Sequence, residues 1–224
     1  MPSYIFRFVR GGIIRYLSQK ETDNAIQRYF KRAGISIKFT EGYHPRPKMV
    51  FTPPVPTGVA STAWYVQIET TEQINVFTLL QSYGHFTIKP IQISRVPDDF
   101  KLQKYIEAFQ YNLYLPIKKF DPSRFTSDNI VTKKTKKSVR RFRMNEAFED
   151  FSYTKLHEYF MVKYTQHLNR AVKYYKLLET LSSNETAELD EEGVYVIVTD
   201  VIFHGKKLSK IINDVGGKNY VRSQ

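Results

Sequence analysis

The sequence predicts an α+β fold in which two ferredoxin-like halves follow one another, each with antiparallel sheets and the element order β-α-β-β-α-β. Both halves show strand-like alternation of apolar residues with helical stripes between the strands, and the pattern breaks near Pro97-Asp98-Asp99. A chain of 224 residues is long enough for two small domains with ordinary cores. We therefore expect residues 1–97 and 98–224 to form the two halves, the second less regular than the first.

The first half has the more regular pattern. Alternation predicts a strand over Ser3–Val9, and the spacing of Ser18 and Glu21 matches a capping box at the start of a helix. That helix is expected to end at Gly34 and to bury an apolar stripe: Ala25, Ile26, Tyr29, Phe30 and Ala33. The pattern then predicts a strand over Ile35–Phe39, a strand over Ala63–Thr70, a helix over Gln73–Tyr83 and a strand over His85–Val96.

The second half repeats this order more loosely. Asp121 followed by Pro122 is typical of a helix start, with a capping residue and a first-turn proline. The other predicted elements are a strand over Ile106–Leu115, an exposed basic hairpin over Ile130–Met144, a strand over Leu156–Tyr164, a helix over Leu168–Leu181 and a strand over Val194–Phe203.

The absence of cysteine limits the chemistry of this chain. It excludes disulfides, a thiol nucleophile, and zinc or iron–sulfur sites with Cys ligands. The five histidines are also too far apart in sequence for the helical His-pair spacing of a metal site. We expect no cofactor and no metal, and any radical chemistry would belong to a partner.

The charge balance favours a polyanionic partner. The net charge is +12, divided as +7 over residues 1–97 and +5 over residues 98–224, and 15% of the residues are aromatic. Folded nucleic-acid-binding proteins combine such charge with aromatic rings for stacking, although aromatic residues in a basic protein can also simply fill its core. No apolar run is long enough to span a membrane, and strand-like alternation from Ser3 leaves no room for a signal peptide, so a cytoplasmic protein is expected.

The most specific local sequence is a proline-braced loop over Gly42–Pro56, which contains five prolines and therefore cannot pair throughout as a central strand. A stiff loop of this kind presents its polar side chains with little freedom to lose on binding. The residues expected to act in it are Tyr43, His44, Arg46 and Lys48. The alternative is that the prolines only shape a connection and that His44 makes a structural hydrogen bond.

A run of cations over Lys133–Arg143 supplies the second candidate site, with seven Lys and Arg in eleven residues. Its members are Lys133, Lys134, Lys136, Lys137, Arg140, Arg141 and Arg143, and Phe142 lies among them. Each cation can neutralise a phosphate and Phe142 can stack a base, whereas a solvated hairpin protected by lysines from edge pairing is the alternative. Arg7, Arg10 and Arg15 flank the first strand and the turn after it, and Arg7 and Arg15 are candidates for RNA binding. Arg7 either lines a groove or decorates the solvated face of the sheet.

Three stretches resemble an uncharacterised bacterial family of radical SAM-linked proteins. They are Gly12-Ile13-Ile14-Arg15-Tyr16-Leu17-Ser18, Lys31-Arg32-Ala33-Gly34, and Glu41-Gly42-Tyr43-His44-Pro45-Arg46-Pro47-Lys48 through Pro56-Thr57-Gly58. The resemblance is strong over residues 3–97 and faint afterwards, at Thr132-Lys133-Lys134 and Val198-Thr199-Asp200. It implies a radical SAM protein as partner and an RNA context. Many members carry His then Asp after the residue matching Ser18, where this chain has Gln19, Lys20 and Glu21, so an enzymatic role would rest on His44.

The duplicated pattern also resembles, at the level of fold alone, the CRISPR repeat-processing endoribonucleases, which bind RNA in a basic cleft without metal. Three hypotheses remain. The first is an RNA-binding accessory protein that works with a radical SAM partner in the modification or processing of rRNA or tRNA. The second is a metal-independent RNA-cleaving or RNA-modifying enzyme with His44 as general acid or base. The third is an adaptor that docks an acidic protein; the oligomeric state is not predicted.

Overall fold

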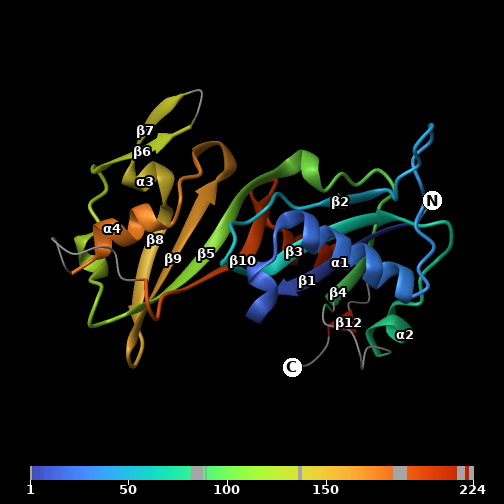
Figure 1. The fold of residues 1–224 in the computed structure, drawn as a ribbon, viewed down its shortest axis with the longest axis horizontal. Helices are drawn as coiled ribbons and strands as arrows, with labels where there is room; N and C mark the ends of the chain where they lie inside the picture. Colours follow the sequence, from blue (N-terminus) through green and yellow to red (C-terminus); the bar gives the residue numbers. More distant parts are fainter. Residues whose placement is uncertain are drawn as a thin grey trace. The chain divides into compact units, whose positions relative to one another are not determined.

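The structure is a computed structural model that describes residues 2–81, 88, 90–135, 138–183, 191–215 and 220–221. It confirms a mixed α+β architecture with antiparallel strand pairing. The chain divides into two compact units, one formed by Met1–Ile106 with Asp200–Gln224 and the other by Glu107–Thr199 (Figure 1). The first boundary therefore lies later than the junction expected at Pro97-Asp98, and the C-terminal segment belongs to the first unit.

The first unit is built around the central strand β1. Its elements in chain order are β1 (Ser3–Arg10), the 3-10 turn η1 (Gly12–Tyr16), α1 (Gln19–Arg32), β2 (Met49–Phe51), β3 (Ala60–Glu69), α2 (Val76–Gln81), β4 (Pro90–Val96), η2 (Gln103–Tyr105), the end of β10 (Tyr195–Phe203), β11 (Lys206–Lys207), α5 (Leu208–Val215) and β12 (Tyr220–Val221). β1 pairs with β3 on one side and with β4 on the other, while β2 pairs with β3 and β12 with β4. From β1 to β4 strands and helices alternate as predicted, but the strand after α1 is β2, which lies within the proline-braced loop, and not the predicted strand over Ile35–Phe39.

One face of β1 packs against α1 to form an aromatic core. Phe6 meets Phe30 of α1 edge-on at a centroid distance of 4.9 Å, and Phe8 meets Tyr29 at 5.5 Å. Ile26 is buried beside them, so the helical stripe predicted from its spacing covers this face of the sheet, as Figure 1 shows for α1. Burial of large aromatic side chains is the main stabilising contribution to such a core.

The start and end of α1 also follow the sequence prediction. The Ser18 backbone N–H donates to Glu21 Oε2 at 2.8 Å, and the Glu21 N–H donates to Ser18 Oγ at 3.3 Å, which completes the capping box. Hydrogen bonding to Ser18 holds the pKa of the Glu21 carboxyl below its usual value. Gly34 has a positive φ of 65°, the conformation that ends helices and suits glycine.

The opposite face of this sheet carries polar groups that tie down chain segments. Gln67 donates from Nε2 to the Phe100 carbonyl at 2.7 Å and accepts from the Leu102 N–H at 2.9 Å. Gln92 donates to Asn213 of α5 at 2.7 Å, which fastens that helix to β4. The sequence pattern did not predict α5.

The second unit contains a strand, β8 (Glu149–Lys155), that the sequence pattern did not predict. Its elements are β5 (Ile106–Pro116), η3 (Pro122–Arg124), β6 (Ile130–Lys134), β7 (Val139–Arg143), α3 (Met144–Ala147), β8 (Glu149–Lys155), β9 (Tyr159–His167), η4 (Leu168–Arg170), α4 (Tyr175–Leu181) and the start of β10. β9 lies between β5 and β8, and β6 pairs with β7 as a separate two-stranded sheet. Tyr111 and Tyr164 stack at 5.0 Å within the core of this unit.

Three predicted elements are corrected. Ile35–Phe39 is not a regular strand, because Ile37 bridges Thr70 whereas Phe39 bridges Pro47, so the segment changes partner within three residues. The helix expected after Asp121 is a single turn: Asp121 does accept from the Ser123 N–H at 3.0 Å, but the turn ends at Arg124. The helix expected over Leu168–Leu181 is divided into η4 and α4 by the extended backbone of Ala171, at φ −58° and ψ 121°.

A buried arginine holds the end of β1. Arg10 is 2% exposed, and its guanidinium donates to the backbone carbonyls of Val55 at 3.2 Å, Arg15 at 3.1 Å and Leu17 at 2.7 Å. Among the described residues no carboxylate pairs with it. Burial accordingly lowers the pKa of Arg10 from its usual value.

Replacement of Arg10 is expected to destabilise the protein strongly. Arg10→Met leaves three carbonyls without their charged donor and should lower the free energy of unfolding by about 3 kcal/mol, measured by urea denaturation. Arg28, which is exposed on α1, offers a matched control, and Arg28→Met should change stability by less than about 0.5 kcal/mol. Equal effects of the two substitutions would contradict a structural role for Arg10.

Candidate functional site

The tip of the proline-braced loop is closed by a short hairpin-like ladder. Phe39 and Pro47 form a bridge, the Thr40 N–H donates to the Arg46 carbonyl at 2.8 Å, and the Arg46 N–H donates to Thr40 Oγ1 at 3.0 Å. Two prolines, Pro45 and Pro47, restrict the backbone on the returning side. The loop tip is therefore fixed by backbone contacts that leave its side chains available.

The side chains at this tip face solvent. Tyr43 is 94% exposed, and the His44 ring meets its edge at a centroid distance of 5.0 Å. Across the described residues, neither His44 nor Arg46 forms a side-chain hydrogen bond or an ion pair. Thus no carboxylate or second base of the described chain contacts His44, and the side chains of Tyr43, His44 and Arg46 are exposed.

Lys48 differs from Arg46 because it is already paired. Its Nζ lies 3.3 Å from Glu69 Oε2, and both side chains are about one-third exposed, at 34% and 32%. An anion that binds Lys48 has to compete with Glu69, whereas Arg46 offers an uncommitted guanidinium with a two-pronged donor geometry.

Arg7 and Arg15 contact aromatic rings of their own unit. Arg7 Nε donates to the Thr62 carbonyl at 2.6 Å, and the Arg7 guanidinium lies 5.5 Å from the Tyr65 ring centroid. Arg15 donates to the Tyr16 hydroxyl at 2.6 Å and lies 4.8 Å from that ring, while Tyr16 is 57% exposed. Their assignment to an RNA surface stays a prediction.

A groove lies beside this loop in the first unit. Its volume is about 760 Å³, and its lining combines apolar side chains with cations from α1: Asn24, Gln27, Arg28, Phe30, Lys31, Ile35, Ser36, Ile37, Phe39, Pro47 and Met49. Phe39 is 53% exposed next to the loop ladder. The sequence alone does not reveal this groove, because its residues come from three separate segments.

The run of cations forms the predicted hairpin, but its charges divide between two faces. Lys133 lies opposite Arg140, Thr132 opposite Arg141, and Lys134 opposite Val139. Because successive strand residues point to opposite faces, Lys133 and Arg140 share one face with Phe142, whereas Lys134 and Arg141 lie on the other. Lys136 and Lys137 lie outside the described residues.

The pair formed by Lys133 and Arg140 places two like charges directly across the strands. Like charges in this position are destabilising. Of the hairpin cations that the structure describes, Arg143 is the one that meets a carboxylate, at 3.9 Å from Asp128. Lys133, Lys134, Arg140 and Arg141 have no counter-ion among the described residues.

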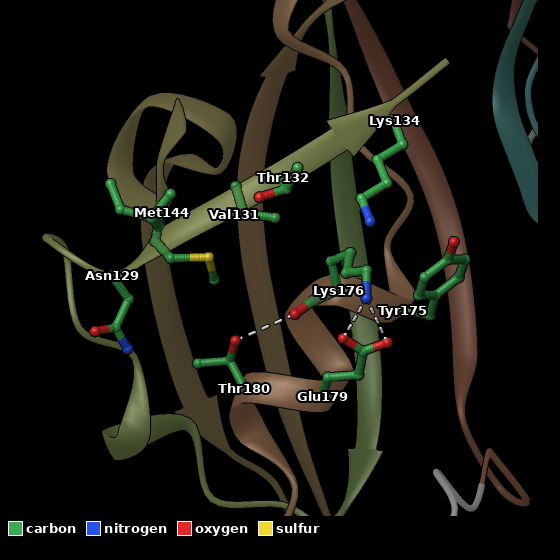
Figure 2. Close-up of a pocket in the computed structure, with 10 residues that line it drawn as sticks. Asn129, Val131, Thr132, Lys134, Met144, Tyr175, Lys176, Glu179 and Thr180 are labelled. Carbon is green, nitrogen blue, oxygen red and sulfur yellow. Dashed lines mark hydrogen bonds and ion pairs between the residues drawn. The ribbon is translucent and has the colours of Figure 1, made fainter. Parts of the chain in front are cut away.

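A pocket of about 720 Å³ lies in the second unit under β6. Its lining comes from β6 and its flanks, from the start of α3, and from α4: Asn129, Ile130, Val131, Thr132, Lys134, Met144, Tyr175, Lys176, Glu179 and Thr180. Figure 2 shows Lys134 reaching from β6 toward Lys176 and Tyr175 of α4. The charge run in the sequence places Lys134 on the hairpin surface and gives no sign of its approach to α4.

Two other kinds of feature are absent from the described part of the chain. No group of three or more His, Asp or Glu side chains is placed there to hold a metal ion. No helix in the described ranges is both long and apolar enough to cross a bilayer.

A family model described as "Uncharacterized protein conserved in bacteria (DUF2344)" matches residues 3–198 of the chain. The match covers the first-unit loop, the basic hairpin and the pocket alike. A comparison with curated proteins found no match.

Substitutions at the loop tip distinguish a binding loop from a catalytic one. We expect Arg46→Ala to weaken RNA binding by about tenfold through loss of one charge-assisted hydrogen bond, and His44→Ala to weaken it much less. The measurement is the dissociation constant of each variant, with single-turnover product formation assayed in parallel. RNA turnover by the wild type that disappears in His44→Ala with affinity intact would instead identify a catalytic histidine.

Proposed function

We propose an RNA-binding function for this chain, which belongs to the uncharacterised bacterial protein family DUF2344. The observation that carries the proposal is the cross-strand pair of Lys133 and Arg140 on the β6–β7 hairpin. Both cations lie without a counter-ion from the described residues, next to the half-buried ring of Phe142. RNA phosphates supply the missing anions, and an aromatic ring offers a stacking surface for a base.

The energetics of the hairpin support this function over a purely solvated one. Lysines that protect a strand edge from aggregation do not need to face one another. Facing cations cost stability in the free protein, and that cost is recovered when an anion bridges them. A polyanion with regularly spaced charges satisfies several such positions together, which a single small anion does not.

The first unit contributes a second contact surface in this proposal. Arg46 would contact the RNA backbone and the exposed Tyr43 ring would stack, with the loop ladder limiting the entropy lost on binding. The strand pairing β4-β1-β3-β2 and the element order of residues 3–96 support a ferredoxin-like fold for this half. We extend that fold to the second half only as a proposal.

We also propose that the chain acts as an accessory protein to a radical SAM partner in rRNA or tRNA modification or processing. The support is the sequence resemblance of the Gly12–Ser18 and Glu41–Lys48 motifs together with the absence of cysteine. A chain without thiolates cannot ligate an iron–sulfur cluster through Cys, so a partner would carry that chemistry. The exposed His44, with no acid or base of the described residues in contact, favours binding over catalysis.

Reversal of one charge in the facing pair tests the proposed RNA surface. Arg140→Glu would lie opposite Lys133 and replace repulsion with attraction, so the hairpin should become more stable by roughly 0.2 to 1 kcal/mol. RNA affinity should nevertheless fall, and the log–log salt slope should become less steep by about 0.7 for each phosphate that the variant no longer neutralises. Binding is measured by fluorescence anisotropy over a salt series and stability by thermal unfolding.

Lys155→Glu provides the matched control, because it makes the same change in net charge on an exposed position of β8 in the same unit. It should lower RNA affinity much less than Arg140→Glu does. If both substitutions reduce affinity equally, only net charge matters and the hairpin is not the site. If wild-type protein binds no RNA at low salt, a protein-docking function replaces the proposal.

A further inference from the structure

The pocket beneath β6 brings two ammonium groups together from distant parts of the chain. Lys134 ends β6 and Lys176 lies in the first turn of α4, and Figure 2 shows both side chains directed toward the same space beside Tyr175. The Lys176 ammonium lies 5.3 Å from the centroid of the Tyr175 ring. This juxtaposition depends on the fold rather than on sequence proximity.

The charges in this pocket do not balance. Lys176 donates to both carboxylate oxygens of Glu179, at 2.9 Å and 2.6 Å, so these two side chains neutralise one another. Lys134 forms no ion pair with any described residue. The pocket is therefore left with one uncompensated positive charge, on Lys134, and a second ammonium, on Lys176, that still has a free donor hydrogen.

The rest of the lining suits a ligand larger than a bare anion. A volume of about 720 Å³ lies within the range of small-molecule sites and exceeds what a phosphate ion needs. Val131 and Met144 are buried and supply an apolar wall, while Asn129 and Thr132 add polar groups. Thr180 Oγ1 donates its proton to the Lys176 carbonyl at 3.1 Å, so its lone pairs are available to a donor on a ligand.

We propose that this pocket binds a nucleoside 5′-monophosphate group, with the phosphate on Lys134 and Lys176 and the nucleoside against the apolar and amide lining. The ligand is either a free nucleotide or the 5′-terminal nucleotide of an RNA, which share this chemistry. The choice of a nucleoside rests on the proposed RNA-binding function, whereas the assignment of a phosphate rests on the two ammonium groups alone. Lys134 lines this pocket and its neighbour Lys133 does not, so the two lysines have separate roles.

The two sources of the ligand are separated by two binding measurements on the full chain. The first titrates AMP and inorganic phosphate into the protein by calorimetry. The second compares two 3′-labelled RNAs of one sequence, one with a 5′-phosphate and one with a 5′-hydroxyl, by fluorescence anisotropy. If the protein prefers the 5′-phosphate RNA by about tenfold, which is the effect of one charge-assisted hydrogen bond, the ligand is the 5′ terminus of an RNA. If AMP binds and the RNAs show no such preference, the ligand is a free nucleotide.

Two substitutions with opposite expected effects test the assignment. Lys134→Ala should remove the 5′-phosphate preference and weaken AMP binding by about tenfold. Glu179→Gln should strengthen both, because it releases Lys176 from its ion pair and removes a negative charge from the pocket. The matched control is Lys133→Ala, which should weaken both RNAs equally and leave AMP binding unchanged.

Failure of this proposal is distinguishable from failure of the RNA-binding proposal. If AMP binds, Lys134→Ala weakens that binding, and neither RNA binds, the result supports the pocket proposal and contradicts the RNA-binding proposal. If the RNAs bind without 5′-phosphate preference and AMP does not bind, the pocket assignment is overturned. AMP binding that Lys134→Ala leaves unchanged in a folded variant also overturns it.

Discussion

The first unit depends on one buried guanidinium. A charge that leaves water is costly unless its hydrogen-bonding capacity is met, and Arg10 meets most of it with three backbone carbonyls instead of a carboxylate. Two of those carbonyls, of Arg15 and Leu17, lie in or directly after the turn that precedes the Ser18 capping box. The third belongs to Val55 in the proline-braced loop. The same side chain therefore fixes where α1 begins and where the loop returns to the sheet, and the aromatic core depends on the placement of α1.

The parts of the fold that could be predicted are those specified by short-range chemistry. The Ser18–Glu21 capping box, the apolar stripe of α1 and the alternation of β1 all act within a few residues, and each is present as predicted. The errors occur where pairing with residues distant in the sequence determines the secondary structure. β8 was missed because its sequence, Glu149–Lys155, is largely polar and its apolar residues are few, which is compatible with an outer strand of the sheet. Ile35–Phe39 has strand-like composition, yet its two bridges go to different partners.

The candidate site shows the same limit. Sequence alone predicted the basic hairpin over Ile130–Met144 and the proline-braced loop over Gly42–Pro56, because charge runs and prolines are visible without a fold. The sequence analysis treated the hairpin cations as one candidate site. The strand register instead pairs Lys133 with Arg140 on one face of the hairpin and places Lys134 on the other face. No sequence signal joins Lys134 to Lys176, since their approach requires the packing of α4 against β6. Arg10 was grouped with Arg7 and Arg15, although its burial gives it a different role.

The hairpin itself links stability to ligand binding. An isolated two-stranded sheet is marginal in water, and β6–β7 is anchored at one end, where Val131 is buried and the Met144 N–H donates to the Asn129 carbonyl at 2.8 Å. Toward its other end, the facing pair of Lys133 and Arg140 contributes repulsion instead of packing. An anion that contacts both cations binds only the formed hairpin, so it must shift the local equilibrium toward that form in proportion to its affinity. Opposite charges at these two positions would stabilise the free hairpin without this dependence. Under the proposed RNA-binding function, the pair of Lys133 and Arg140 would therefore link the pairing of β6 with β7 to the binding of RNA.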